Sequence, residues 1–187
     1  MIRRLLPIGT IGIVASAWVV LFLLNHWLFT SLEIHQYIAW IFLPAAVRML
    51  AVMQFGWIGA IGLFVGALVT NGPILLSQPA VAFSLSALSA IGPVIATYMG
   101  TRILAVPRDI GSLDMLHLYV FAALGAVCSS VLHNLYFWRD GVPAHWEDSL
   151  VPMLLGDMLG TTIVLIAGAV VLRWRRAAGP TELTRSD

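Results

Sequence analysis

The sequence contains no lysine and little charge of any kind. Its 187 residues include ten arginines and nine aspartates or glutamates, and the formal net charge is +1. A soluble domain of this length carries roughly a quarter charged residues, because it needs a hydrated surface. The chain therefore lacks the surface of a soluble protein. Its near-zero net charge also gives no electrostatic basis for binding nucleic acid, and we expect no such partner.

Cysteine is almost absent too, since Cys128 is the only one. A single thiol excludes a disulfide within the chain and a metal site made of several thiolates. The sequence also lacks a phosphate-binding loop and a recognisable nucleophile–base pair. We therefore predict that the protein is not an enzyme and has no catalytic residues and no cofactor. We interpret Cys128 as a buried, inert thiol.

Apolar sequence, in contrast, is abundant: 60% of the residues are hydrophobic, and the mean hydropathy is +0.93. A helix that crosses a bilayer needs about 20 mostly apolar residues. Six segments can supply one, so we predict an all-α polytopic membrane protein, a six-transmembrane-helix bundle. The predicted spans are Leu6–Phe29, Tyr37–Gln54, Trp57–Leu76, Ala82–Leu104, Leu116–Phe137 and Leu150–Leu172.

These spans leave no room for a second folded domain. We predict one transmembrane domain over residues 1–172 and a short Arg-rich cytoplasmic tail over residues 173–187. The first apolar run exceeds the roughly 7–15 residues typical of a signal peptide, so we expect it to be retained. The very short turn before Trp57 predicts an antiparallel hairpin of spans two and three. Asn71-Gly72-Pro73 interrupts the third span, which leaves residues 74–81 either as a re-entrant segment or as a surface stretch.

The arginines are distributed unevenly between the two sides of the predicted bundle. With a cytoplasmic N-terminus, eight arginines fall on the cytoplasmic side, and only Arg139 falls in the outer loops. Cytoplasmic ends of membrane proteins are enriched in basic residues. We therefore predict cytoplasmic N- and C-termini (N-in/C-in) and a multi-pass protein of the bacterial inner membrane, surrounded by the lipid bilayer. The eight residues are Arg3, Arg4, Arg102, Arg108, Arg173, Arg175, Arg176 and Arg185.

Two charged residues, Arg48 and Asp157, fall well inside predicted spans. Each costs about 2.5–3.5 kcal/mol at the centre of a membrane helix, so each should face the interior and find a partner. At a rise of ~1.5 Å per residue their depths differ by about 6 Å, which a guanidinium can bridge. We predict that they pair, directly or through water. The pair is either a neutral link between spans two and six, or part of a polar site for a ligand, an ion or a proton.

Other polar residues inside the spans extend this candidate site. The candidate ligand-binding residues are Arg48, Asp157, Asn71, Thr161 and His133. Histidines near the predicted outer side raise the question of a metal, because imidazole and carboxylate ligands suit Zn or Cu. They are His26, His35, His133 and His145. No metal-binding spacing organises them, so we favour a chance population at the interface and predict no metal site.

Glycines recur at helical spacing in the third and sixth predicted spans. Small residues four positions apart let another backbone approach closely. We therefore expect the sixth span to pack tightly around Asp157 and the third span to present a flat face. The predicted packing residues are Gly56, Gly59, Gly62, Gly66, Gly156 and Gly160.

Two segments carry a resemblance to a known family. The stretch FLPAAVRMLAVMQFGWIGAIGLFVGALVTN (residues 42–71) and the later GDMLGTTIVL (residues 156–165) resemble the first class of bacterial membrane-associated sensor domains, the MASE family. Residues that match its pattern are Pro44, Gly56, Gly66, Gly156, Asp157 and Gly160. The resemblance implies a sensory input that recognises a small ligand or a membrane state. This chain departs from the family's pattern by ending soon after its last span, so either it signals through a separate partner or the fold is used here without signalling. We expect a protein partner or a homo-oligomer.

Two alternatives remain open. The proline-started and glycine-rich segments also resemble substrate-binding subunits of energy-coupling-factor transporters, small six-helix proteins that work beside a membrane coupler. In that family small residues of the first helix form the contact, and Gly9, Gly12, Ala15 and Ala17 match this description. The other alternative is an accessory subunit of a larger membrane complex, which requires no ligand.

Overall fold

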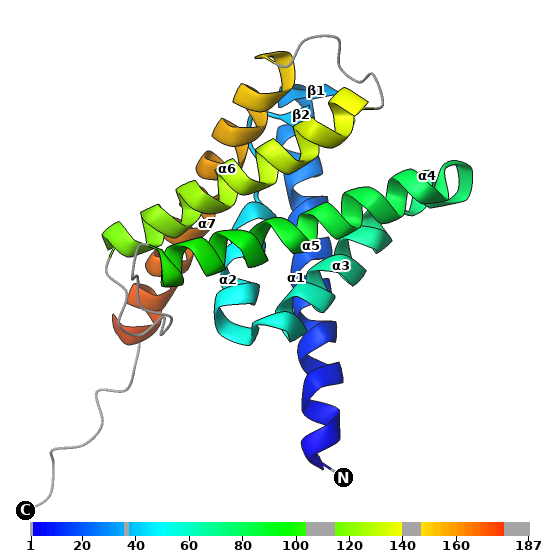
Figure 1. Ribbon diagram of the computed structural model, residues 1–187. Helices are drawn as coiled ribbons and strands as arrows, with labels where there is room; N and C mark the ends of the chain where they lie inside the picture. The colour runs from blue at the N-terminus through cyan, green and yellow to red at the C-terminus, as the bar shows by residue number, and fades with distance from the viewer. Residues whose placement is uncertain (1, 36–37, 104–114, 140–146, 178–187) are drawn as a thin grey trace, which may run out of the picture.

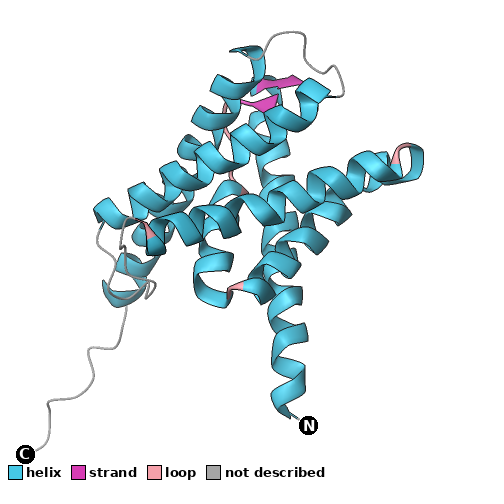
Figure 2. Cartoon of the chain, viewed as in Figure 1, coloured by secondary structure: helices cyan, strands magenta, loops and turns pink. Residues whose placement is uncertain are grey.

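The computed structural model describes residues 2–35, 38–103, 115–139 and 147–177, and these residues fold almost entirely into helices (Figures 1 and 2). The only sheet among them is one antiparallel pair of short strands. The predicted all-α class is therefore confirmed. The elements are α1 (Ile2–Phe29), η1 (Thr30–Leu32), β1 (Glu33–His35), β2 (Ile38–Ala39), α2 (Ala45–Phe55), α3 (Trp57–Thr70), α4 (Gly72–Ser77), α5 (Pro79–Arg102), α6 (Met115–Arg139) and α7 (Glu147–Ala177).

Four stretches of the described chain are long and apolar enough to cross a membrane, and they suggest that the protein inserts into one. They are Pro7–Leu32, Pro79–Arg102, Leu116–Arg139 and Asp148–Val171. The remaining two predicted spans correspond to the shorter apolar helices α2 and α3. α7 continues through Ala177, so the start of the predicted tail is helical, and residues 178–187 lie outside the described part.

The prediction of a continuous second span is wrong. Helix α2 begins only at Ala45 and has 11 residues, a length of about 16 Å, or half of a bilayer core. Before it, the chain runs through β2 and then through a segment, Trp40–Pro44, that is not helical. Pro44 explains the boundary, because a proline disfavours helical conformation in the residue before it and is well accommodated where a helix starts.

The third span breaks where the sequence predicted. Helix α3 ends at Thr70, and α4 begins at Gly72 with Pro73 in its first turn. Residues 74–81 are mostly helical, because α4 runs to Ser77 and α5 begins at Pro79. Leu76 is 90% exposed, and Figure 1 shows α4 at the periphery, at the end of α5 farther from α7.

The short helix α2 is the centre of the arrangement. It packs against α1, α3, α5, α6 and α7. Helix α1 lies mainly along α3, and its N-terminal part extends beyond the other helices (Figure 1). α5 pairs with α6, and α6 with α7. The side chains of α2 therefore meet every long helix among them: Ala51 and Val52 pack with residues of α1, α3 and α5, and Met49 and Met53 with residues of α6.

The turn between α2 and α3 confirms the predicted hairpin. Gly56 joins the two helices with a φ of 56°, a conformation that glycine adopts without strain. Three residues later, the Cα of Gly59 faces the backbone carbonyl of Ala51 so closely that a side chain would collide with it. The predicted flat face of α3 continues toward α1, where a Cβ at Gly66 would lie 2.9 Å from the Cβ of Trp18. Gly62 meets α1 in the same way.

Gly156 and Gly160 of α7 also admit another backbone, but that backbone is not a helix. A Cβ at Gly156 would collide with the carbonyl oxygen of Ala39, and one at Gly160 with that of Phe42. The partner is the non-helical segment before α2, whose narrow backbone reaches closer to α7 than a helix could. The glycine pair therefore creates the groove in which this segment lies.

We predict that Gly160→Ala destabilises the protein by about 1–3 kcal/mol, because the added methyl group overpacks the contact with the Phe42 carbonyl. The matched control is Gly168→Ala on the same helix, where no atom lies within 4 Å of the added Cβ. That change should be neutral or stabilising by up to about 1 kcal/mol. Thermal unfolding of both variants in nanodiscs measures the difference. Equal stability of the two variants would contradict the close contact.

Candidate functional site

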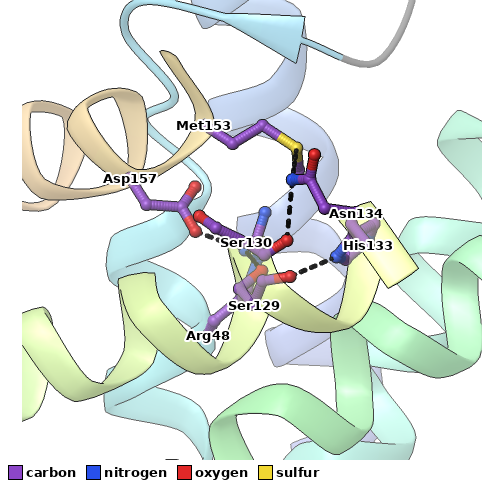
Figure 3. A network of polar contacts seen from close by, with 7 residues as sticks. All are labelled: Arg48, Ser129, Ser130, His133, Asn134, Met153 and Asp157. Atoms are coloured by element: carbon purple, nitrogen blue, oxygen red, sulfur yellow. Dashed lines mark hydrogen bonds and ion pairs between the residues drawn. The ribbon is translucent and has the colours of Figure 1, made fainter. Parts of the chain in front are cut away.

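The predicted pair of Arg48 and Asp157 is present at the centre of the bundle. Nη1 of Arg48 lies 2.7 Å from Oδ2 of Asp157, and the two side chains are only 8% and 6% exposed. The same Nη1 also donates a hydrogen bond to the hydroxyl of Ser129 on α6. Figure 3 shows how the three side chains converge from α2, α6 and α7. One guanidinium therefore connects three helices.

Two aromatic rings complete the surroundings of Arg48. Its guanidinium carbon lies 4.8 Å from the ring centroid of Phe42 and 5.5 Å from that of Trp18. The two rings lie edge to face, with centroids 5.9 Å apart. Cation–π contacts of this kind are stronger where water is excluded. Nε of Arg48, however, has no hydrogen-bond partner among the described residues.

The non-helical segment before α2 is held by hydrogen bonds from three other elements. The N–H of Trp40 donates to the carbonyl of Leu32 at 3.1 Å, and the N–H of Phe42 donates to the carbonyl of Gly156 at 3.0 Å. The N–H of Leu43 donates to Oδ1 of Asn25 on α1 at 2.8 Å. Backbone groups away from water must be paired in this way, so these bonds permit an irregular segment inside the bundle.

Asn25 was not among the predicted site residues, although it is 96% buried and accepts a hydrogen bond from the N–H of Leu43. The signal in the sequence was the amide of Asn25, which directly follows the apolar run Val19–Leu24 inside the predicted span Leu6–Phe29. We interpreted that run as a uniform span. A polar side chain at such a position requires a partner, and the proline that interrupts the next span provides unpaired backbone groups to be satisfied.

Polar side chains also follow the inner face of α6 from Ser129 toward the end of the helix (Figure 3). Nδ1 of His133 lies 2.9 Å from the carbonyl of Ser129, and because a carbonyl only accepts, Nδ1 carries the hydrogen. The amide of Asn134 donates to the carbonyl of Ser130 at 2.8 Å. Its Oδ1 accepts a hydrogen bond from the hydroxyl of Ser149, which joins α6 to the start of α7. All five residues are buried.

A cavity of about 350 Å³ adjoins the ion pair. Four of the five predicted ligand-binding residues line it: Arg48, Asp157, Asn71 and His133. Thr161 does not line this cavity, and instead lines a second cavity of about 10 Å³ beside the same ion pair. Residues that the sequence did not predict also contribute to the larger cavity, among them Asn25 of α1 and Ser89 of α5.

The cavity reaches the surface near the end of α1. His26 and Glu33 belong to its lining, and their side chains are 61% and 31% exposed. Nδ1 of His26 lies 3.1 Å from Oε1 of Glu33. Within the described ranges, no three His, Cys, Asp or Glu side chains come together as a metal site, and His145 lies outside those ranges. Cys128, which we expected to be buried, is half-buried.

Comparison of the chain with protein-family models, curated proteins and solved structures finds no match. The resemblance to sensor domains therefore stays a prediction from its motifs. Any proposal for this protein depends on the chemistry and geometry of the site.

We predict that Arg48→Ala and Asp157→Ala each destabilise the protein by about 3–5 kcal/mol, because either change leaves one buried charge without its partner. The double variant should lose less stability than the sum of the two. Thermal or denaturant unfolding in a fixed lipid composition measures all three. Arg139→Ala, which removes an exposed arginine, is the control and should have little effect. If the stability lost by the double variant equals the sum of the two single losses, Arg48 and Asp157 do not stabilise each other.

Proposed function

We propose that this protein is the ligand-recognition component of a membrane sensor. It binds a small molecule in the cavity beside Arg48 and Asp157 and transmits the binding through a separate protein partner. The observation that carries this proposal is the cavity itself: about 350 Å³, reached near His26 and Glu33, with a buried ion pair and the amides of Asn25 and Asn71 on its wall. Ligand sites generally occupy about 300–1,000 Å³ and combine apolar walls with a few polar groups.

The interrupted second span supports binding rather than a purely structural role. In membrane proteins, irregular backbone at membrane depth is found where it lines a cavity or is covered by protein, and broken helices often carry the substrate site. Here Ala39 of β2 and Phe42 of the irregular segment line the cavity together with Arg48 of α2. An ion pair needed only to join two helices does not require an adjoining cavity.

We further propose six membrane crossings with both termini in the cytoplasm, in a bacterial inner membrane. In this arrangement α1, α3, α5, α6 and α7 each cross once, and the irregular segment and α2 together make the second crossing. The eight-to-one distribution of arginines supports this orientation. The mouth of the cavity then faces the outer side.

The partner would dock on the exposed part of α1. No atom lies within 4 Å of a Cβ built at Gly9 or Gly12, so this face is uncovered in the single chain. Ala15 does not belong to it, because its Cα lies 3.1 Å from a Cβ built at Gly66 and so faces α3. The same observation favours a second candidate function, a substrate-binding subunit whose transport partner holds this face.

We predict that native mass spectrometry of the protein in its own lipids detects a retained small molecule at about one copy per chain. Ser89→Phe should abolish it, because Ser89 is 6% exposed and lines the cavity. Ile91→Phe, on an exposed face of the same helix, should retain it. A stoichiometric protein partner with nothing bound in the cavity would contradict ligand recognition and indicate an accessory subunit.

We predict that a membrane-impermeant maleimide labels Ser31→Cys in intact cells but labels Arg102→Cys only after permeabilisation. Both residues are exposed, and they lie at opposite ends of the proposed crossings. The measurement requires a Cys128→Ala background, because Cys128 is only half-buried. Labelling of both variants in intact cells would contradict the six-crossing arrangement, and the reverse pattern would contradict its orientation.

A further inference from the structure

We infer that the cavity selects an uncharged, planar molecule that carries both a hydrogen-bond acceptor and a hydrogen-bond donor, as amides and lactams fused or attached to an aromatic ring do. This inference rests on the proposed function and specifies its ligand. It follows from three properties of the cavity wall: the balance of its charges, the unused hydrogen-bonding groups of two amides, and its aromatic surface.

The charges on the buried part of the wall cancel. Arg48 and Asp157 are 2.7 Å apart, so neither offers a free counter-charge to a ligand. An anion that approached Arg48 would meet the carboxylate of Asp157, and a cation at Asp157 would meet the guanidinium. Among the described lining residues, Glu33 is the other one with a charged side chain, and it lies at the exposed mouth beside His26. A charged ligand would therefore lose its hydration without gaining a partner, whereas an uncharged ligand avoids this cost.

Asn25 offers a hydrogen-bond donor. Its side chain must present oxygen to the N–H of Leu43, because only the oxygen of an amide accepts a hydrogen bond. The NH₂ group of Asn25 then has no partner among the described residues, and the residue lines the cavity. A donor that is open to the cavity can bind an acceptor supplied by a ligand.

Asn71 offers the complementary acceptor. The hydroxyl hydrogen of Ser86 is directed to the carbonyl of Ala82, at 2.7 Å, so the same hydroxyl can only accept from Asn71. Asn71 therefore presents its NH₂ to Ser86, at 3.2 Å, and its Oδ1 has no partner in the described part of the chain. Asn71 also lines the cavity. The two amides together provide one donor and one acceptor.

The remaining wall favours a flat ring. Trp18, Phe22 and Phe42 line the cavity, and aromatic side chains pack well against planar π systems by stacking or edge contacts. The volume of about 350 Å³ is at the small end for ligand sites, which suits a small ligand. A small aromatic amide satisfies the charge, hydrogen-bonding and shape requirements together.

Three isosteric probes test this inference: benzamide, benzoate and benzamidinium, which are neutral, anionic and cationic at pH 7. Their binding to the full-length protein in nanodiscs can be followed by saturation-transfer NMR with competition. We expect the dissociation constant of benzamide to be at least tenfold lower than those of the two ions. We also expect Asn25→Asp to shift the preference to benzamidinium, because the variant keeps an oxygen for Leu43 and makes the wall negative.

Gln54→Glu is the control, since it adds the same charge at an exposed position at the end of α2 and should preserve the preference for benzamide. If the wild-type protein prefers benzoate or benzamidinium, the ligand class is overturned while ligand recognition stands. If none of the three probes binds at millimolar concentration, the ligand class is likewise overturned, whereas ligand recognition itself is decided by whether native mass spectrometry detects a retained small molecule. Even if Asn25→Asp does not fold, the order of the three dissociation constants for the wild-type protein shows whether the cavity selects an uncharged ligand.

Discussion

The structure depends on satisfying one irregular piece of backbone inside an apolar bundle. In the segment Trp40–Pro44, the N–H groups of Trp40, Phe42 and Leu43 make no helical hydrogen bonds, and in a membrane no water is available to pair with them. Its N–H groups are therefore paired with a side chain of α1 and a carbonyl of α7, and two glycines of α7 leave room for it. Because α2 starts where this segment ends, these contacts also determine where Arg48 lies.

The ion pair and the cavity follow from that position. An 11-residue helix that begins halfway through the bundle places its first turns, and Arg48 with them, against the middle of α6 and α7. The segment before it, Trp40–Pro44, is a single non-helical chain, which fills less space than a helix would. The cavity occupies the region beside this chain, between α1, α3, α5 and α7. A continuous second helix would fill part of this space.

Much of this arrangement could be predicted from the sequence. The length of the apolar segments predicted the four long helices. The high cost of an isolated charge in a membrane predicted the pairing of Arg48 with Asp157. The irregular segment was missed because its residues are as apolar as those of a helix, and hydropathy does not detect backbone conformation. Asn25 was missed for a related reason: its partner is a backbone N–H, which has no signature in the sequence.

The distance in sequence between Arg48 and Asp157, 109 residues, has a consequence for assembly. At ~5–20 residues synthesised per second, α7 emerges roughly 5–20 s after α2. Asn25 is already present when Leu43 is made, but the carboxylate for Arg48 and the carbonyl for Phe42 both come from the last helix. The newly made chain therefore holds an unpaired charge until α7 is inserted. The central site is completed only when α7 joins the helices that precede it.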